Sequence, residues 1–150
     1  MIFTEVKQDK KMYIDLLLLA DEQENMIDRY LERGTMYALS DEADSKVKAV
    51  CVVTDEGSSV LEIKNIAVLP ECQRMGFGRY MIRFIENTYK GAYDVLRVGT
   101  GDSPLTIPFY QKCGFTEAYR IKGFFTDNYD HPIFECGKQL VDMVCLEKNL

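Results

Sequence analysis

Short runs of apolar residues alternate with polar ones along the chain, and their spacing switches between the period of a strand and that of a helix. Strands are predicted over residues 2–6, 36–39, 47–53, 60–69, 93–98, 115–121 and 140–146. Helices are predicted over 10–19, over 21–31 with Asp21 as the N-cap, after Gly78, and over 106–113. Because strands and helices mix along the chain, the pattern predicts an α/β fold.

The fourth predicted strand does not keep its alternation in phase. Leu61 and Ile63 occupy odd positions, whereas Ile66 and Val68, which continue the apolar pattern, occupy even ones. One extra residue inserted as a β-bulge at 64–65 would produce this slip. The sequence therefore predicts a bulged strand, and a loop with two glycines follows it.

The chain has 150 residues, of which 47% are hydrophobic and 28% charged, and this composition predicts one globular domain over 1–150. Its net charge of −6 argues against binding to nucleic acid or an anionic membrane and favours a cationic small substrate. The first residues lack the features of a signal peptide, and no apolar run could span a membrane, so a cytoplasmic protein is expected. Five scattered cysteines and a single histidine argue against a metal site.

The loop before the third helix has the features of an anion-binding turn. Its glycines at 76 and 78 let the backbone approach a phosphate, and its amides meet the positive end of the helix dipole. The candidate binding residues are Gln73, Arg74, Met75, Gly76, Phe77, Gly78 and Arg79. The pattern matches neither the Rossmann fingerprint nor the Walker loop. Taken alone it is equally consistent with a tight connection, and a nucleotide-binding fold is a further alternative.

A second motif, Phe109-Tyr110-Gln111-Lys112-Cys113-Gly114-Phe115, follows one strand and one loop later. Together with the loop at 73–78 it resembles the GNAT superfamily of acetyl-CoA-dependent N-acetyltransferases, in which a (Gln/Arg)-x-x-Gly-x-(Gly/Ala) loop precedes a Tyr-x-Lys-x-Gly-Phe segment. The resemblance covers nearly the whole chain and is weakest before residue 35 and over 124–137. It implies a GNAT-like acyl-CoA N-acyltransferase fold, a mixed central sheet of about six to seven strands with a bulged strand before the phosphate loop and helices on both faces.

The resemblance also implies how acetyl-CoA binds. In the family, the loop at 73–78 binds the pyrophosphate, and the unpaired backbone of the bulged strand, here Ile66, Ala67 and Val68, holds the pantetheine arm. A backbone N–H near Ile66 would then polarise the thioester carbonyl. Many members carry an asparagine seven residues before the motif tyrosine, where this chain has Ser103. Ser103 can take a weaker form of that contact, or Asp102 can replace it.

Two side chains are the catalytic candidates. Glu62 lies fourteen residues before Gly76, like the catalytic glutamate of the family's histone-acetylating members, and would take the proton of the attacking amine directly or through a water. Its alternative role is a strand carboxylate paired with Lys64. Tyr110 matches the tyrosine that protonates the departing thiolate in the family, and its alternative role is a core aromatic residue.

The predicted function is transfer of acetyl from acetyl-CoA to a primary amine of a small molecule or peptide, by direct attack and without a metal. The alternative is a non-catalytic acyl-CoA-binding or regulatory module. Because dimers are common in the family, a homodimer is one state that the resemblance implies. Acceptor specificity is expected from acidic and aromatic residues of the first helices and the last loop: Asp21, Glu22, Glu24, Phe124, Phe125, Asp127, Tyr129, Asp130, Phe134 and Glu135.

Overall fold

A seven-stranded sheet forms the centre of the computed structural model, which describes residues 1–150. Its strands follow the order β1-β2-β3-β4-β5-β9-β6, and only the neighbours β4 and β5 run parallel. The strand bounds are β1 Ile2–Val6, β2 Thr35–Ser40, β3 Val47–Asp55, β4 Val60–Val68, β5 Val95–Gly101, β6 Thr116–Ile121 and β9 Met143–Asn149. The mixed α/β architecture predicted from the sequence is confirmed.

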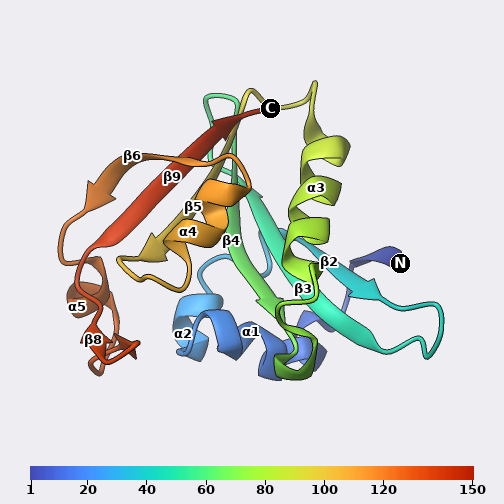
Figure 1. Ribbon diagram of the computed structural model, residues 1–150, viewed down its shortest axis with the longest axis horizontal. Coiled ribbons are helices and arrows are strands. Elements are labelled where there is room, and N and C mark those ends of the chain that lie inside the picture. Colours follow the sequence, from blue (N-terminus) through green and yellow to red (C-terminus); the bar gives the residue numbers. More distant parts are fainter.

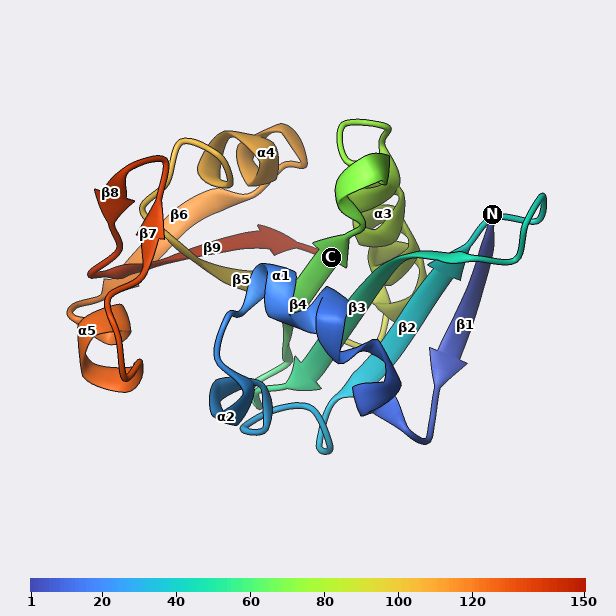
Figure 2. The same ribbon diagram turned by 90° about the horizontal axis from the view of Figure 1, so that it is seen from below.

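Helices cover both faces of the sheet, as Figure 2 shows. A 3-10 turn at Lys10–Tyr13, α1 (Ile14–Ala20) and α2 (Glu24–Ile27) lie on one face. On the other face lie α3 (Phe77–Tyr89), which follows a 3-10 turn at Pro70–Cys72, and α4 (Ile107–Lys112). None of these helices is both long enough and apolar enough to cross a membrane.

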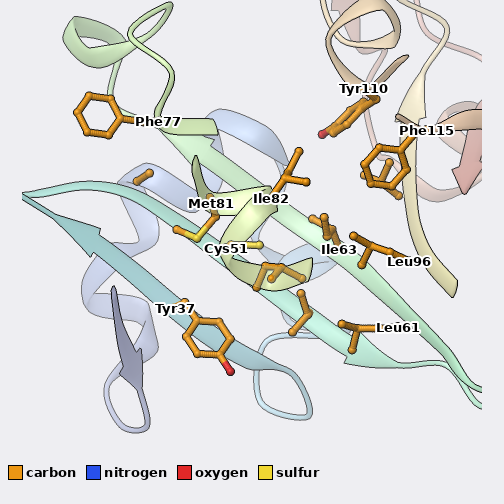
Figure 3. Close-up of a cluster of buried hydrophobic side chains, with 14 of the residues drawn as sticks. Tyr37, Cys51, Leu61, Ile63, Phe77, Met81, Ile82, Leu96, Tyr110 and Phe115 are labelled. Atoms are coloured by element: carbon orange, nitrogen blue, oxygen red, sulfur yellow. The ribbon is translucent and has the colours of Figure 1, made fainter. Parts of the chain in front are cut away.

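Each face of the sheet has its own buried core. On the first face Leu17 and Ile27 pack against the strands. On the second face, drawn in Figure 3, Met81 and Ile82 of α3 pack on Leu61 and Ile63 of β4. The apolar face of α3 therefore packs on the sheet as its helical spacing predicts, and this core holds the helix against β4, the strand that precedes it.

The bulge predicted in β4 is present. Val52 of β3 pairs with Asn65, and the next residue, Val53, pairs with Ile63, so Lys64 has no partner across the ladder. The insertion returns Ile66 and Val68 to the core face that Leu61 and Ile63 occupy before it.

Beyond the bulge the sheet divides between β4 and β5. The two strands pair only from Val60 and Val95 to Ile63 and Val98. β4 then continues to Val68 beside β3, whereas β5 continues beside β9, and Figure 1 shows the two halves of the sheet diverging. The bulge and the divergence coincide, so one inserted residue opens the sheet in the middle.

The segment at 124–139, called the strap here, consists of α5 (Phe124–Asn128), β7 (Phe134–Glu135) and β8 (Lys138–Gln139). It contacts the chain between α1 and α2, where one sequence prediction was wrong. Asp21 is not an N-cap, because α2 begins at Glu24 after Gln23. The Asp21 carboxylate instead accepts hydrogen bonds from Tyr30 at 2.9 Å and from Tyr129 of the strap at 2.5 Å.

Candidate active site

The divergence of β4 and β5 leaves a cavity of about 430 Å³, called the gap cavity here. Five residues singled out from the sequence for cofactor binding or catalysis line it: Ile66, Ala67, Val68, Gln73 and Tyr110. They come from β4, from the loop that follows it and from α4. The fold therefore brings one residue of each sequence motif, Gln73 and Tyr110, to this cavity, whereas residues 74–79 do not line it.

The backbone of β4 presents free hydrogen-bonding groups to this cavity. The Leu69 amide donates to the Lys48 carbonyl of β3 at 2.8 Å, and backbone groups alternate in direction along a strand. Ala67 therefore faces β3, whereas Ile66 and Val68 face the gap. The Val68 carbonyl accepts a bond from Gln73 Nε2 at 3.2 Å, and no protein acceptor takes the Ile66 N–H on the side where β5 has turned away.

The loop before α3 has a run of unused amides. Arg74 and Gly76 have positive φ values of 64° and 89°, which turn the chain sharply into the helix that begins at Phe77. The backbone N–H groups from 74 to 79 have no acceptor within the protein. Together with the positive end of a 13-residue helix they form a binding site for an anion.

The side chains of this loop divide between solvent and core. Arg74 and Met75 are exposed, whereas Phe77 is buried, so only the amide of Phe77 can face a ligand. A Cβ at Gly78 would lie 3.1 Å from the ring of Phe109, so glycine allows a close approach where α3 packs on α4. Arg79 donates to the carbonyl of Lys112 at 3.4 Å, which also joins the two helices.

Tyr110 is buried, yet its hydroxyl has no hydrogen-bond partner in the protein. Asn65 Oδ1 is the one side-chain oxygen or nitrogen that is both buried and unbonded, so the Tyr110 hydroxyl is not sealed in the core but opens to the gap cavity that the residue lines. Figure 3 shows its ring extending from α4 with the oxygen toward the strands. Burial raises the pKa of Tyr110, so the phenol keeps its proton at neutral pH.

Ser103 lies outside the lining of the gap cavity. It is buried, and its hydroxyl accepts a bond from the Leu105 amide at 3.1 Å, which supports the loop before α4. Asp102 pairs instead with Arg120 at 3.0 Å. The polar lining at this end comes from Thr100 and Thr106, whose hydroxyls are 2.7 Å apart. Thr100 and Thr106 belong to no motif, so no sequence pattern marks them as lining residues. The contact of Ser103 with the cofactor stays a prediction.

Glu62 lines a second cavity of about 360 Å³, called the side hollow here, on the face of the sheet that α2 covers. Its carboxylate is 2.6 Å from Lys64 Nζ and 3.6 Å from the guanidinium of Arg97. The pairing with Lys64 is the alternative role that the sequence suggested. The side hollow does not include Tyr110, so the two catalytic candidates lie on different cavities.

The two cavities meet where β4 and β5 part. Six residues line both of them, and they are called the junction here: Asp21, Ile63, Lys64, Gly99, Tyr129 and Met143. Asp21 is the only carboxylate of this set. The two cavities therefore share part of their walls, and Asp21 belongs to that shared part.

The strap closes over the junction through contacts with the α1–α2 segment. Besides the bond from Tyr129 to Asp21, the Asp130 amide donates to Gln23 Oε1 at 2.9 Å. His131 lies between two carboxylates, 2.6 Å from Asp130 and 3.2 Å from Glu22. The first helices and the last loop, both expected to select the acceptor, therefore form one wall.

Protonation of His131 should strengthen this closure. The carboxylates of Asp130 and Glu22 raise its pKa above 6.5, so the contribution of these contacts is fully present below about pH 6.5 and is lost as the pH rises through the higher folded-state value. As the only histidine in the chain, it gives a single imidazole signal for titration by NMR. We expect a pKa above 6.5 that falls in Glu22→Gln and is unchanged in Glu24→Gln, whose carboxylate pairs with Lys11. A wild-type value at or below 6.5 would contradict these contacts.

Comparison with known proteins identifies this arrangement. The family described as acetyltransferase (GNAT) domain matches residues 32–117. The uncharacterised N-acetyltransferase YvbK of Bacillus subtilis (strain 168) is 40% identical over 138 residues, which cover 91% of this chain and 88% of that protein. The chain belongs to the GNAT acetyltransferase family.

Solved structures extend the GNAT assignment to the cosubstrate. A GNAT family acetyltransferase from Elizabethkingia anophelis with acetyl-CoA bound is 33% identical, with a TM-score of 0.93 over 99% of this chain and 97% of that one. A Bacillus subtilis acetyltransferase in complex with CoA is 36% identical, with a TM-score of 0.88 over 99% and 97%. The fold, the acyltransferase activity and acetyl-CoA as cosubstrate, all expected from the sequence, are confirmed.

Proposed function

We propose that this GNAT enzyme acetylates a primary amine of a small molecule or peptide, with residues 1–150 acting as one domain. The observation that supports an amine acceptor is Asp21, a carboxylate at the junction with no cationic partner within ion-pair distance. A carboxylate in that place attracts an ammonium group to the point where β4 and β5 part. The net charge of −6 attracts the same kind of substrate over a longer range.

The residues divide the reaction between them. The amides from 74 to 79 bind the pyrophosphate of acetyl-CoA, and the free N–H of Ile66 polarises the thioester carbonyl. The amine nitrogen attacks the carbonyl carbon directly, so the N–C bond forms and the C–S bond breaks without a covalent enzyme intermediate. Glu62 first takes one proton from the ammonium group, directly or through a water, so that the free amine can attack. Tyr110 gives its proton to the departing sulfur and regains one from the proton that the nitrogen loses after attack, directly or through water.

A screen of amines with acetyl-CoA tests this function. Protein lysines, polyamines, aminoglycosides and amino acids are offered in turn, release of the CoA thiol is followed, and the product is identified by mass spectrometry. We expect thiol release that depends on the amine and a product that carries the acetyl group on nitrogen. Thiol release with no amine dependence, or acetylation on oxygen alone, would contradict the proposal.

The role of Glu62 is tested by Glu62→Gln. Loss of a general base typically lowers the rate by about 10²-fold or more, so we expect kcat to fall by that factor while the Kd for acetyl-CoA stays the same. Glu147→Gln is the matched control, because Glu147 also pairs with Arg97, at 2.9 Å, yet lines neither cavity. If Glu62→Gln keeps the wild-type kcat, its carboxylate serves only the ion pairs with Lys64 and Arg97.

A further inference from the structure

Most charged side chains of the side hollow are paired with one another or with a neighbour. Arg33 pairs with Glu56 at 3.0 Å. Lys64 and Arg97 both pair with Glu62. Seven charged side chains line the hollow, namely Asp21, Arg29, Arg33, Glu56, Glu62, Lys64 and Arg97, and only Asp21 and Arg29 have no partner of opposite charge. Asp21 and Arg29 therefore form no ion pair in the hollow, although Arg29 is near enough for its charge to act against the rise in the pKa of Asp21.

The surroundings of Asp21 suit an ammonium group. Both carboxylate oxygens accept a bond from a tyrosine hydroxyl, which fixes the carboxylate in place and leaves lone pairs free. Burial raises the pKa of Asp21, because the carboxylate has lost part of its hydration. A cation that arrives beside it compensates for that loss, and the aromatic rings of Tyr129 and Phe124 add to the attraction.

The surroundings of Arg29 suit a carboxylate. Its side chain is exposed, and one guanidinium nitrogen donates to Asn128 Oδ1 at 3.0 Å. That contact is with a neutral amide of the strap, and it uses only part of the N–H donors of the guanidinium. The remaining N–H groups can bind a carboxylate in the two-pronged geometry that arginine favours.

Asp21 and Arg29 differ in their position relative to the gap cavity. Asp21 belongs to the junction and lines both cavities, whereas Arg29 lines only the side hollow. We propose that the acceptor is a small zwitterion, an amino acid or a similar molecule with an amine and a carboxylate, whose ammonium group pairs with Asp21 and whose carboxylate pairs with Arg29. This inference rests on the proposed function. It places the amine beside the gap and the carboxylate away from it.

Matched pairs of acceptors test this inference. Each amino acid is compared with the amine that lacks its carboxylate: phenylalanine with phenethylamine, lysine with cadaverine, and γ-aminobutyrate with propylamine. With acetyl-CoA saturating, we expect kcat/KM in the best pair to be roughly tenfold or more higher for the member with the carboxylate, as a charge-assisted, two-pronged bond to arginine predicts. Equal values in all pairs, or higher values for the plain amines, would overturn the inference while leaving acetylation of amines intact.

The variant Arg29→Met tests whether Arg29 causes the preference for acceptors that carry a carboxylate. We expect it to lower kcat/KM for the carboxylate member by roughly tenfold, mainly through KM, and to change the plain amine by less than twofold. Arg83→Met is the control, because Arg83 is exposed on the outer side of α3 and lines neither cavity. An equal loss for both members would overturn the pairing with Arg29. If no amine of either kind is acetylated, the proposed function fails and this inference fails with it.

Discussion

Tyr110→Phe lowers kcat for acetyl transfer by at least about 10²-fold, which is the usual contribution of a positioned proton donor. The expectation follows from a hydroxyl on a buried ring that has no partner in the protein and opens to the gap cavity that Ile66 also lines. Because phenylalanine keeps the ring and its contacts with Phe109 and Phe115, the packing of α4 should survive. The Kd for acetyl-CoA, measured by calorimetry, should therefore change little while thiol release slows.

Tyr93→Phe is the control for this variant. Its hydroxyl bonds to Asp55 at 3.1 Å and lines neither cavity, so removing it should leave the rate of thiol release unchanged. If Tyr110→Phe turns over as fast as the wild type, the thiolate leaves without help from this residue, and the proton must come from elsewhere, for example from solvent.

Gly76→Ala raises the Kd for acetyl-CoA by roughly tenfold or more. Gly76 has a φ of 89°, a left-handed conformation that costs alanine about 1–2 kcal/mol, and this conformation turns the amides of 74–79 toward one point. A loop that relaxes this strain no longer directs those amides together. Equilibrium binding of acetyl-CoA and urea unfolding, measured on the same samples, separate the loss of binding from the loss of stability.

Gly57→Ala is the matched control for the loop. Gly57 has a φ of 82°, and at both glycines a Cβ would meet no atom within 4 Å. The two variants should therefore lose similar stability, about 1–2 kcal/mol each. Only Gly76→Ala should bind acetyl-CoA more weakly. Equal binding by both variants would mean that the conformation of this loop does not determine how the cosubstrate is held.

The bulge in β4 shows what local pattern can predict. The apolar alternation changes phase between Ile63 and Ile66, and this change can be seen in neighbouring residues of the sequence. The structure places the inserted residue at Lys64, as the pattern requires. The turn at 73–78 and the start of α3 are equally local, since glycine positions and helical spacing decide them. These features were predictable because each depends on residues within a few positions of one another.

Asp21 shows what local pattern cannot predict. Its place before Glu24 is typical of an N-cap, and the capping prediction was wrong because Tyr129, far along the chain, binds the same carboxylate. Contacts of that range depend on how the strap folds back over α1 and α2, which no neighbouring residue specifies. The pairing of Glu62 with both Lys64 and Arg97 depends in the same way on which strand lies beside β4.

The most direct test is a crystal structure of this chain with acetyl-CoA. Our account predicts that the pyrophosphate oxygens accept hydrogen bonds from the amides between 74 and 79, and that the thioester lies in the gap between β4 and β5, with its carbonyl at the Ile66 N–H and its sulfur near the Tyr110 hydroxyl. A structure in which the pyrophosphate binds elsewhere, or in which the gap stays closed to the thioester, would contradict it.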